Sequence, residues 1–442
     1  MPRDDSLDGP MLTLAAITYR GFALPGATSP ILRREMTGLI GRLAPVKNHW
    51  SVVWGPASFR AGLNAFDDAA MFVAQNRQHT SQVVIAVRGT NPVSVFDWLL
   101  GDLMVARQVP WSYGRPGDVA DARISFSTAL GLSILQRLRW DPGDGSATEQ
   151  TQDSAASPLP PLLANLRQTL RDLRGQLTAS LRAAGAATNA ASNQPFATRV
   201  ETLLQLQSSP EAARGLQAFD DAVGHLAGAR LDPLRLVLGG TMLQQAFERG
   251  VTLQEFLKNL LARATDPVDV YVTGHSKGGA LCTALATWLA DTQGREPVAV
   301  AEPWDPDRNA TVHAYGFAGP TPGNGAFARH VDAVLDGRCH RIANHLDLVP
   351  YAWSTRDLGA VADLYPVSPL EQTILHDLTA QLIRRVKHLD YQHAGADSIA
   401  LPGIPRPGKP LGDQIVHQHL DGYFEQLKLD GEMGTPTFFG PF

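Results

Sequence analysis

Residues 270–286 read VYVTGHSKGGALCTALA and place a serine between glycines that lie two residues away on each side. The residues before the serine, 268–273, are apolar and rich in β-branched side chains, whereas residues 280–290 are apolar and helix-forming. These patterns predict a strand that enters a tight turn and leaves it as a helix buried against a sheet. The segment therefore predicts one strand-turn-helix unit of an α/β protein.

The turn itself matches the G-x-S-x-G nucleophile elbow, in which a sharp strand-to-helix turn lifts the serine above the sheet edge. Glycine is expected at Gly274 and Gly278 because the backbone on the two sides of the turn comes too close for a β-carbon. A glycine-rich structural turn has the same letters, but it does not need an apolar strand before it and an apolar helix after it. We therefore predict that Ser276 is a nucleophile.

The two residues beside the serine invite a catalytic role that the turn does not favour. The side chains of His275 and Lys277 are expected to point away from the reacting group, so neither is predicted to be the base. We expect His275 to be packed and hydrogen-bonded. We expect Lys277 to act through its main-chain N–H, which follows the nucleophile and would face a developing oxyanion.

Outward from the elbow, further apolar runs predict the rest of the sheet. Strands are expected at residues 82–87, 311–317 and 339–344, with a helix at residues 325–335 between the last two. A capping box formed by Thr252 and Glu255 predicts the start of another helix before the elbow strand. Strands that alternate with helices indicate a mainly parallel sheet covered by helices on both faces.

Residues 141–232 differ from this pattern and are predicted to be a helical insertion that divides the domain into 1–140 and 233–442. The region opens with a linker-like stretch rich in Gly, Ser and Pro, and seven leucines from Leu162 to Leu181 then follow one helical face. Arginines lie on the opposite face. A hairpin packed on the body, a cap over the active site and an amphipathic helix at an anionic lipid surface all fit this pattern.

Composition narrows the class of protein. The chain has 442 residues with 44% hydrophobic and 18% charged residues, and its formal net charge of −5 indicates no general attraction to nucleic acid. Its only cysteines, Cys282 and Cys339, are expected to be unbridged buried thiols. The acidic start and the lack of a long apolar run predict a soluble protein without a signal peptide or transmembrane segment, either cytoplasmic or exported by a leaderless route.

Four separate blocks resemble the class 3 lipase family, the fungal-lipase-like branch of the α/β-hydrolases. These blocks are VIAVRGTNPVSVFDWLLGDL at 84–103, the elbow, YGFAGPTPGNGAFARHV at 315–331 and RIANHLDLVPY at 341–351. They occur in the family's order and cover most of residues 85–351 outside the insertion. The resemblance implies an α/β-hydrolase fold and a serine hydrolase that needs no cofactor.

The family pattern assigns the catalytic acid and the base. Asp347 matches the acid of the fourth block, and its place at the end of a strand suits an aspartate that orients an imidazole. The order serine, acid, histidine directs the search for the base to the C-terminal part. His419 matches the family histidine that shortly precedes a tyrosine, while His417 and His393 remain alternatives. A metal site at His388, Asp390 and His393 lacks a convincing set of ligands.

The first block supplies the remaining expectations for the site. The resemblance implies that the Thr90 backbone N–H completes the oxyanion hole opposite Lys277, with the Thr90 hydroxyl as a further candidate donor. The apolar segment after it is a lid in this family, which makes lid candidates of Val95, Phe96, Trp98 and Leu99. A core helix is the other interpretation of that segment.

The sequence thus predicts a serine carboxylic-ester hydrolase that acts on lipid or other esters, with triacylglycerol lipase as the first choice. A phospholipase A1 and a small-ester or polyester esterase are the alternatives within this chemistry. A pseudoenzyme that binds lipid or a protein partner is the alternative of another class. The expected partner is the ester substrate, either in solution or at an oil–water or membrane interface; protein partners stay unassigned.

Overall fold

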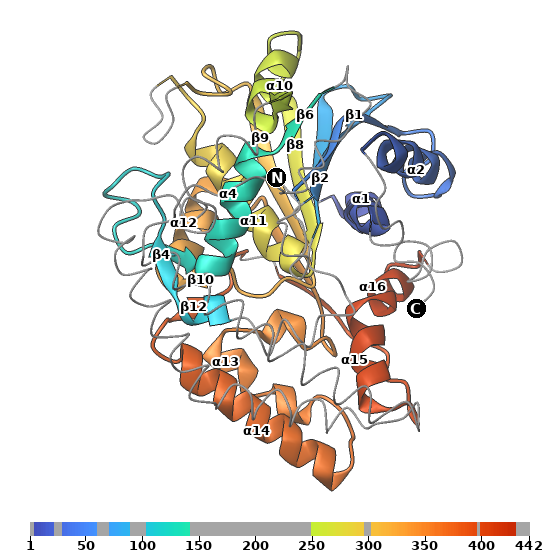
Figure 1. The fold of residues 1–442 in the computed structure, drawn as a ribbon, viewed down its shortest axis with the longest axis vertical. Helices are drawn as coiled ribbons and strands as arrows, with labels where there is room; N and C mark the ends of the chain where they lie inside the picture. The colour runs from blue at the N-terminus through green and yellow to red at the C-terminus, as the bar shows by residue number, and fades with distance from the viewer. Residues whose placement is uncertain are drawn as a thin grey trace, which may run out of the picture.

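The computed structural model describes residues 4–21, 29–59, 70–88, 103–141, 249–295, 302–395 and 398–429. The predicted oxyanion residue Thr90, the four lid candidates and residues 142–232 of the predicted insertion lie outside these ranges. Within the described part, the order of elements is that of an α/β protein with a central sheet between helices (Figure 1).

The central sheet has seven strands in the order β1-β2-β3-β8-β9-β11-β13. Their bounds are β1 Trp50–Ser58, β2 Ala70–Asn76, β3 Gln82–Val87, β8 Val268–His275, β9 Ala310–Phe317, β11 Cys339–Asn344 and β13 Ile399–Leu401. Neighbours from β3 to β13 pair in parallel, whereas β1 with β2 and β2 with β3 are antiparallel. The predicted α/β class with a mainly parallel sheet is therefore confirmed, with an antiparallel edge that the sequence patterns did not reveal.

The central strands follow the predicted ranges closely because they are buried on both faces. Five consecutive side chains of β3, from Val83 to Val87, have no exposed surface, so the strand reads as a continuous apolar run. Strand β1 gives no such run, since its pairing with β2 is interrupted by register shifts at Trp54 and it contains Gly55 and Pro56. Irregular edge strands of this kind are poorly marked in sequence.

Helices cover the two faces of the sheet in separate groups (Figure 1). On one face, a large core is packed beneath α4, α10, α11 and α12, whose bounds are Phe126–Arg137, Leu253–Leu261, Lys277–Asp291 and Gly325–Leu335. The second face is covered by α1, α2 and α16, whose bounds are Asp8–Ile17, Ser29–Arg42 and Asp421–Gln426. Helices α11 and α12 occupy the predicted segments, and Thr252 and Glu255 form the predicted capping box of α10.

Two small sheets stand beside the main one. Strands β4 Gln108–Pro110, β5 Arg123–Ser125, β10 Gly323–Asn324 and β12 Tyr391–Gln392 form one of them, and β6 Arg139–Trp140 pairs with β7 Val251–Thr252 in the other. Because β6 and β7 are antiparallel neighbours, the chain leaves the described domain after Asp141 and returns before Arg249 at adjacent places.

A third core lies under the C-terminal edge of the sheet and is built from α13 Thr355–Leu358, α14 Pro369–Val386 and α15 Leu411–His419, together with short 3-10 turns. It includes Leu346, Leu348 and Val349 from the loop after β11, and Leu411 and Ile415 from α15. The same apolar cluster therefore anchors the loop that carries Asp347 and the helix that ends at His419.

Two further expectations from composition concern the whole chain. Cys282 and Cys339 are both free and buried. Of the helices that the structure describes, none combines the length and the apolar character that crossing a bilayer requires.

Candidate active site

Ser276 occupies a strained turn between β8 and α11. Its backbone has φ 61° and ψ −131°, a region that non-glycine residues rarely adopt and that is typical of functional sites. A β-carbon on Gly274 would lie 2.1 Å from the carbonyl oxygen of Gly278, so the turn has no room for a side chain at that position. The Ser276 N–H donates to the carbonyl of Phe317 on β9 at 2.9 Å, which ties the turn to the neighbouring strand.

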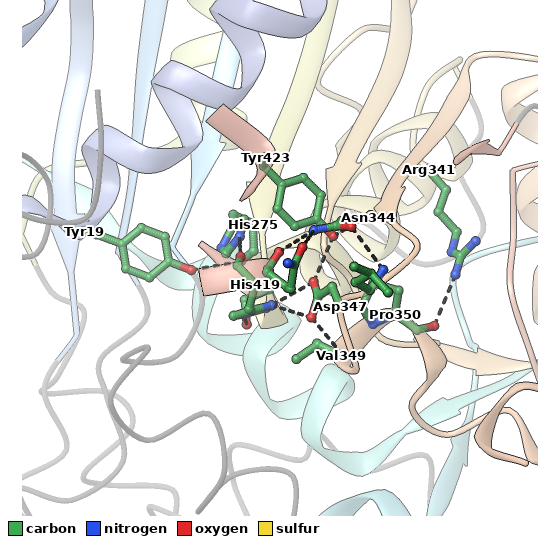
Figure 2. Close-up of polar contacts among 12 residues, drawn as sticks. Tyr19, His275, Arg341, Asn344, Asp347, Val349, Pro350, His419 and Tyr423 are labelled. Carbon is green, nitrogen blue, oxygen red and sulfur yellow. Dashed lines mark hydrogen bonds and ion pairs between the residues drawn. The ribbon is translucent and has the colours of Figure 1, made fainter. Parts of the chain in front are cut away.

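The structure brings Ser276, His419 and Asp347 into one hydrogen-bonded row. The Nε2 atom of His419 lies 3.0 Å from the Oγ atom of Ser276, and its Nδ1 atom lies 2.9 Å and 3.0 Å from the two carboxylate oxygens of Asp347. Ser276 comes from the elbow between β8 and α11, whereas His419 ends α15 and Asp347 lies in the loop after β11 (Figure 2). All three are nearly closed to solvent, with exposed fractions of 2%, 1% and 0%.

This row fixes which nitrogen of His419 carries the proton. A carboxylate can only accept hydrogen bonds, so Nδ1 of His419 must be the donor to Asp347. In the neutral ring, Nε2 is then an acceptor and faces the hydroxyl of Ser276. The arrangement can therefore take a proton from the serine, which is the requirement for a general base next to a nucleophile.

Two further donors hold the Asp347 carboxylate. The Val349 N–H donates to Oδ1 at 3.0 Å, and the Tyr423 hydroxyl donates to Oδ2 at 2.8 Å. The same hydroxyl accepts the Asn344 N–H at 3.0 Å. Burial, together with the nearby negative charge of Asp347, raises the pKa of Tyr423 well above its ordinary value. Tyr423 therefore stays protonated and remains a donor to the carboxylate.

Asn344 joins the strand that precedes Asp347 to the helix that carries His419. Its side-chain amide donates to the main-chain carbonyl and to the Oε1 atom of Gln418, both at 2.8 Å, and its Oδ1 atom accepts the Leu346 N–H at 3.0 Å. Sequence reasoning did not identify Asn344 or Tyr423 as parts of the site. The tyrosine served only as a marker for His419, although its place in QHLDGYF was the available signal.

The loop around Asp347 is also held from outside. The Tyr365 hydroxyl donates to the carbonyl of Leu346, and Arg341 donates to the carbonyl of Pro350 at 3.1 Å. Arg341 also contacts Nε2 of His393 at 3.1 Å. Burial, reinforced by the Arg341 charge, lowers the pKa of His393 well below its ordinary value, so the ring is neutral and accepts from the guanidinium. The loop is therefore fixed at several carbonyls as well as at the carboxylate.

The alternative histidines lie elsewhere. His417 contacts Arg406 at 3.2 Å and Glu425 at 3.3 Å, and His393 contacts Arg341 and Asp357. No hydrogen bond in the described part of the chain links either of them to Ser276. Among the same described residues, including His388 and Asp390, no group of three or more His, Cys, Asp or Glu side chains is arranged to hold a metal ion.

Lys277 is the first residue of α11, and its side chain is partly exposed. The first N–H groups of an α-helix have no acceptor within the helix, and they lie at its positive end. The Lys277 N–H is therefore available beside Ser276. Thr90, the predicted second donor, lies outside the described residues.

His275 is buried, and its side chain lies against the end of α15. The Nε2 atom of His275 is 2.8 Å from the main-chain carbonyl of His419, and the two imidazole rings are 4.8 Å apart. It is therefore a packed, hydrogen-bonded residue and makes no contact that would let it act as the base.

The chain is similar to known lipases in sequence and in structure. The family model described as Lipase (class 3) matches residues 219–356. The crystal structure of M37 lipase superposes with a TM-score of 0.66 at 25% sequence identity, and the match covers 99% of this chain and 98% of that chain. None of the curated proteins matches the sequence.

Two fungal structures are more remote. The Rhizomucor miehei lipase propeptide complex matches with a TM-score of 0.33 at 14% identity, over 79% of this chain and 64% of that chain. A mutant form of MDLA from Penicillium cyclopium matches with a TM-score of 0.34 at 14% identity, over 94% and 86% of the two chains.

Proposed function

We propose that this lipid-ester hydrolase, whose residues 219–356 match the class 3 lipase family model, uses Ser276, His419 and Asp347 as its catalytic triad. The observation that carries this proposal is the pair of contacts made by the His419 ring, at 3.0 Å to the serine oxygen and 2.9 Å to the carboxylate. One imidazole placed between a nucleophile and a buried acid is the arrangement that acyl transfer requires.

In the acylation step, His419 takes the Ser276 proton on Nε2 while the serine oxygen attacks the ester carbonyl carbon. The tetrahedral intermediate then collapses, the bond to the leaving alkoxide breaks, and His419 returns its proton to that oxygen, so that an alcohol leaves and an acyl-serine remains. During this step His419 is an imidazolium, and Asp347 stabilises the charge while it keeps the Nδ1 proton in place.

In the deacylation step, water replaces the serine as the nucleophile. His419 takes a proton from the water molecule, hydroxide attacks the acyl carbon, and the proton passes to the Ser276 oxygen as the fatty acid departs. The proposed donors to the oxyanion are the backbone N–H of Lys277 and that of Thr90. Each such donor is typically worth about 3 kcal/mol of transition-state stabilisation.

Triacylglycerol is the proposed substrate class. The chain carries a net charge of only −5 over 442 residues, so it has no general attraction to anionic headgroups. A neutral lipid ester suits this surface better than an anionic phospholipid. The protein M37, to which the whole chain is similar, is called a lipase, which supports the same choice.

The direct test compares the wild-type enzyme with Ser276→Ala on three substrates: a long-chain triacylglycerol emulsion, anionic phosphatidylglycerol vesicles and a short-chain p-nitrophenyl ester. We expect the wild type to release fatty acid fastest from the emulsion and Ser276→Ala to be inactive on all three. Ser51→Ala, on the edge strand β1, is the matched control and should keep full activity. Hydrolysis that survives Ser276→Ala would overturn the serine mechanism, and a preference for the short ester or for phospholipid would overturn the substrate assignment.

A further inference from the structure

His275 lies in the same turn as the nucleophile, but its side chain contacts the main chain at the end of helix α15. It directly precedes Ser276, and its ring lies among three others: that of His419 at 4.8 Å, that of Tyr423 at 5.7 Å and that of Tyr19 at 6.0 Å. Figure 2 shows the His275 ring beside His419, on the side away from Asp347. The catalytic mechanism described above does not use this buried imidazole.

The acceptor that His275 meets is the main-chain carbonyl at the end of helix α15. Helix α15 ends at His419, and Leu420 breaks the helical path with φ −113° and ψ −83° before α16 begins at Asp421. The last carbonyl groups of an α-helix have no donor within the helix, and a buried carbonyl without a donor is costly. The Nε2 atom of His275 fills this need at 2.8 Å from the His419 carbonyl.

The chemistry of the contact fixes the state of the His275 ring. A carbonyl only accepts, so Nε2 of His275 carries the proton and donates it. Burial first, and then the neighbouring His419, lowers the pKa of His275 well below its ordinary value. The ring therefore stays neutral and places no second positive charge beside His419 when that residue becomes an imidazolium during turnover.

His275 is itself held by the N-terminal segment. The Tyr19 hydroxyl donates to the main-chain carbonyl of His275 at 2.9 Å, and Tyr19 is only 1% exposed. Two residues earlier on the same strand, the Thr273 hydroxyl donates to the carbonyl of Met11 on α1 at 3.1 Å. The N-terminal helix and the turn after it are therefore bonded to the strand that carries the elbow, directly before the nucleophile.

We propose that His275 is a positioning residue: its hydrogen bond to the main-chain carbonyl of His419 sets the distance between the base and the nucleophile. The hydrogen bond from Tyr19 holds His275 in place in turn. The proposal rests on the triad assignment given above. Two consecutive residues of one turn then meet the two ends of the same histidine: Ser276 contacts its ring, and His275 contacts its carbonyl. A shift of α15 along this contact would change the gap between Nε2 and Oγ.

The test separates the hydrogen bond from the volume of the side chain. His275→Gln keeps a donor at about the reach of Nε2, whereas His275→Met has a similar length and no donor. We expect His275→Met to lower kcat for a p-nitrophenyl ester by about 30-fold, the size expected when a catalytic geometry is misplaced, with KM changed less than twofold. His275→Gln should recover most of this loss. His313→Met, on the neighbouring strand β9 and away from the site, is the control and should keep the wild-type kcat.

Two further measurements test how the His275 substitutions lower kcat. The far-downfield proton resonance of the His419 Nδ1–H should shift or broaden in His275→Met and stay close to its wild-type position in His275→Gln. Tyr19→Phe, which keeps the ring and removes the hydroxyl, should lower kcat about threefold at constant KM, and it decides the question if His275→Met does not fold.

The outcomes separate this proposal from the function on which it rests. If Ser276→Ala stays active, the triad assignment fails and this proposal fails with it. If Ser276→Ala is inactive but folded His275→Met retains the wild-type kcat, or loses it to the same extent as His275→Gln, only the positioning role is overturned. Where His275→Met does not fold, a wild-type kcat in Tyr19→Phe overturns it.

Discussion

The two sides of the proposed triad are positioned by different means. Ser276 is placed by the backbone of a single turn, in which Gly274 and Gly278 approach so closely that a β-carbon on the former would lie 2.1 Å from the carbonyl oxygen of the latter. Asp347 and His419 are placed by side chains from distant parts of the chain, which include Tyr423, Asn344 and the third core. One side depends on local geometry, and the other depends on tertiary packing.

This difference predicts how each side responds to substitution. On the nucleophile side, one added β-carbon should disturb the whole turn, because the atoms around it belong to the main chain and cannot rotate away. On the acid and base side, the contacts are several and separate, so that loss of a supporting hydrogen bond should cost less than loss of a reacting group. Three substitutions and one change of pH test this difference between the two sides, in order of decreasing expected effect.

Asp347→Asn should have the largest effect. The amide cannot accept at both positions as the carboxylate does, so His419 loses the partner that holds its Nδ1 proton, and kcat should fall by about 10⁴-fold. Steady-state kinetics on a p-nitrophenyl ester give the value, with KM nearly unchanged. Asp305→Asn, a buried aspartate bonded to Gln293 and to main-chain N–H groups, should lower stability and leave kcat intact. A loss of less than about tenfold in Asp347→Asn would contradict the assigned role.

Gly274→Ala tests the nucleophile side. The added β-carbon meets main-chain atoms, which cannot rotate away, so we expect a loss of about 3 kcal/mol in the free energy of unfolding and nearly complete loss of activity. Urea denaturation measures the first effect. Gly41→Ala on α2 is the control, because nothing lies within 4 Å of its added carbon, and it should be as stable as the wild type or slightly more stable. An active Gly274→Ala enzyme would show that the turn is less constrained than its geometry implies.

Tyr423→Phe tests a supporting contact on the other side. It removes the donor to Asp347 and leaves the buried Asn344 N–H without its acceptor, which should lower stability by about 2 kcal/mol. Because the bond between His419 and Asp347 remains, kcat should fall only about tenfold. Tyr391→Phe loses a buried hydrogen bond to Val105 and should keep the wild-type kcat. A loss as large as that of Asp347→Asn would show that the tyrosine is indispensable to the acid.

Acid should weaken the fold through two buried histidines, His275 and His393. Burial lowers the pKa of both well below the ordinary 6.5. As the pH falls, these histidines therefore bind protons in the unfolded chain before they do so in the folded chain. Their contribution to stability is complete above pH 6.5 and declines below it, by at most about 1.4 kcal/mol per pH unit for each group. Unfolding curves between pH 7 and pH 5 should therefore fall less steeply in His393→Gln than in the wild type. Parallel curves would show that His393 takes its proton in the folded state too.

The comparison also explains how much of the molecule the sequence could reveal. The strands β3, β8, β9 and β11 are marked by apolar runs because both of their faces are buried, and the elbow has a local motif. The edge strand β1 lacks such a signal, because Gly55 and Pro56 interrupt it and its pairing with β2 is irregular. Helix α1, which packs against β8 beside the site, was not among the predicted helices, since its role depends on a partner strand far along the chain.

The site divides in the same way. Ser276 followed from residues that are neighbours in sequence, whereas Asp347 and His419 came from a family pattern that left His417 and His393 as alternatives for the base. Tyr423 and Tyr19 were missed because their contacts span 76 and 256 residues, and no periodic pattern records such a separation. A local turn such as the elbow can be predicted from one sequence, whereas contacts between residues far apart in the chain are found mainly in the structure.

The most direct test of the central claim is covalent labelling with a long-chain alkyl phosphonate p-nitrophenyl ester, followed by peptide mass spectrometry. The account predicts one phosphonyl group on Ser276, attached about 100-fold more slowly in His419→Ala and at the wild-type rate in His417→Ala. A label on another residue, or equal loss of rate in the two histidine variants, would contradict it.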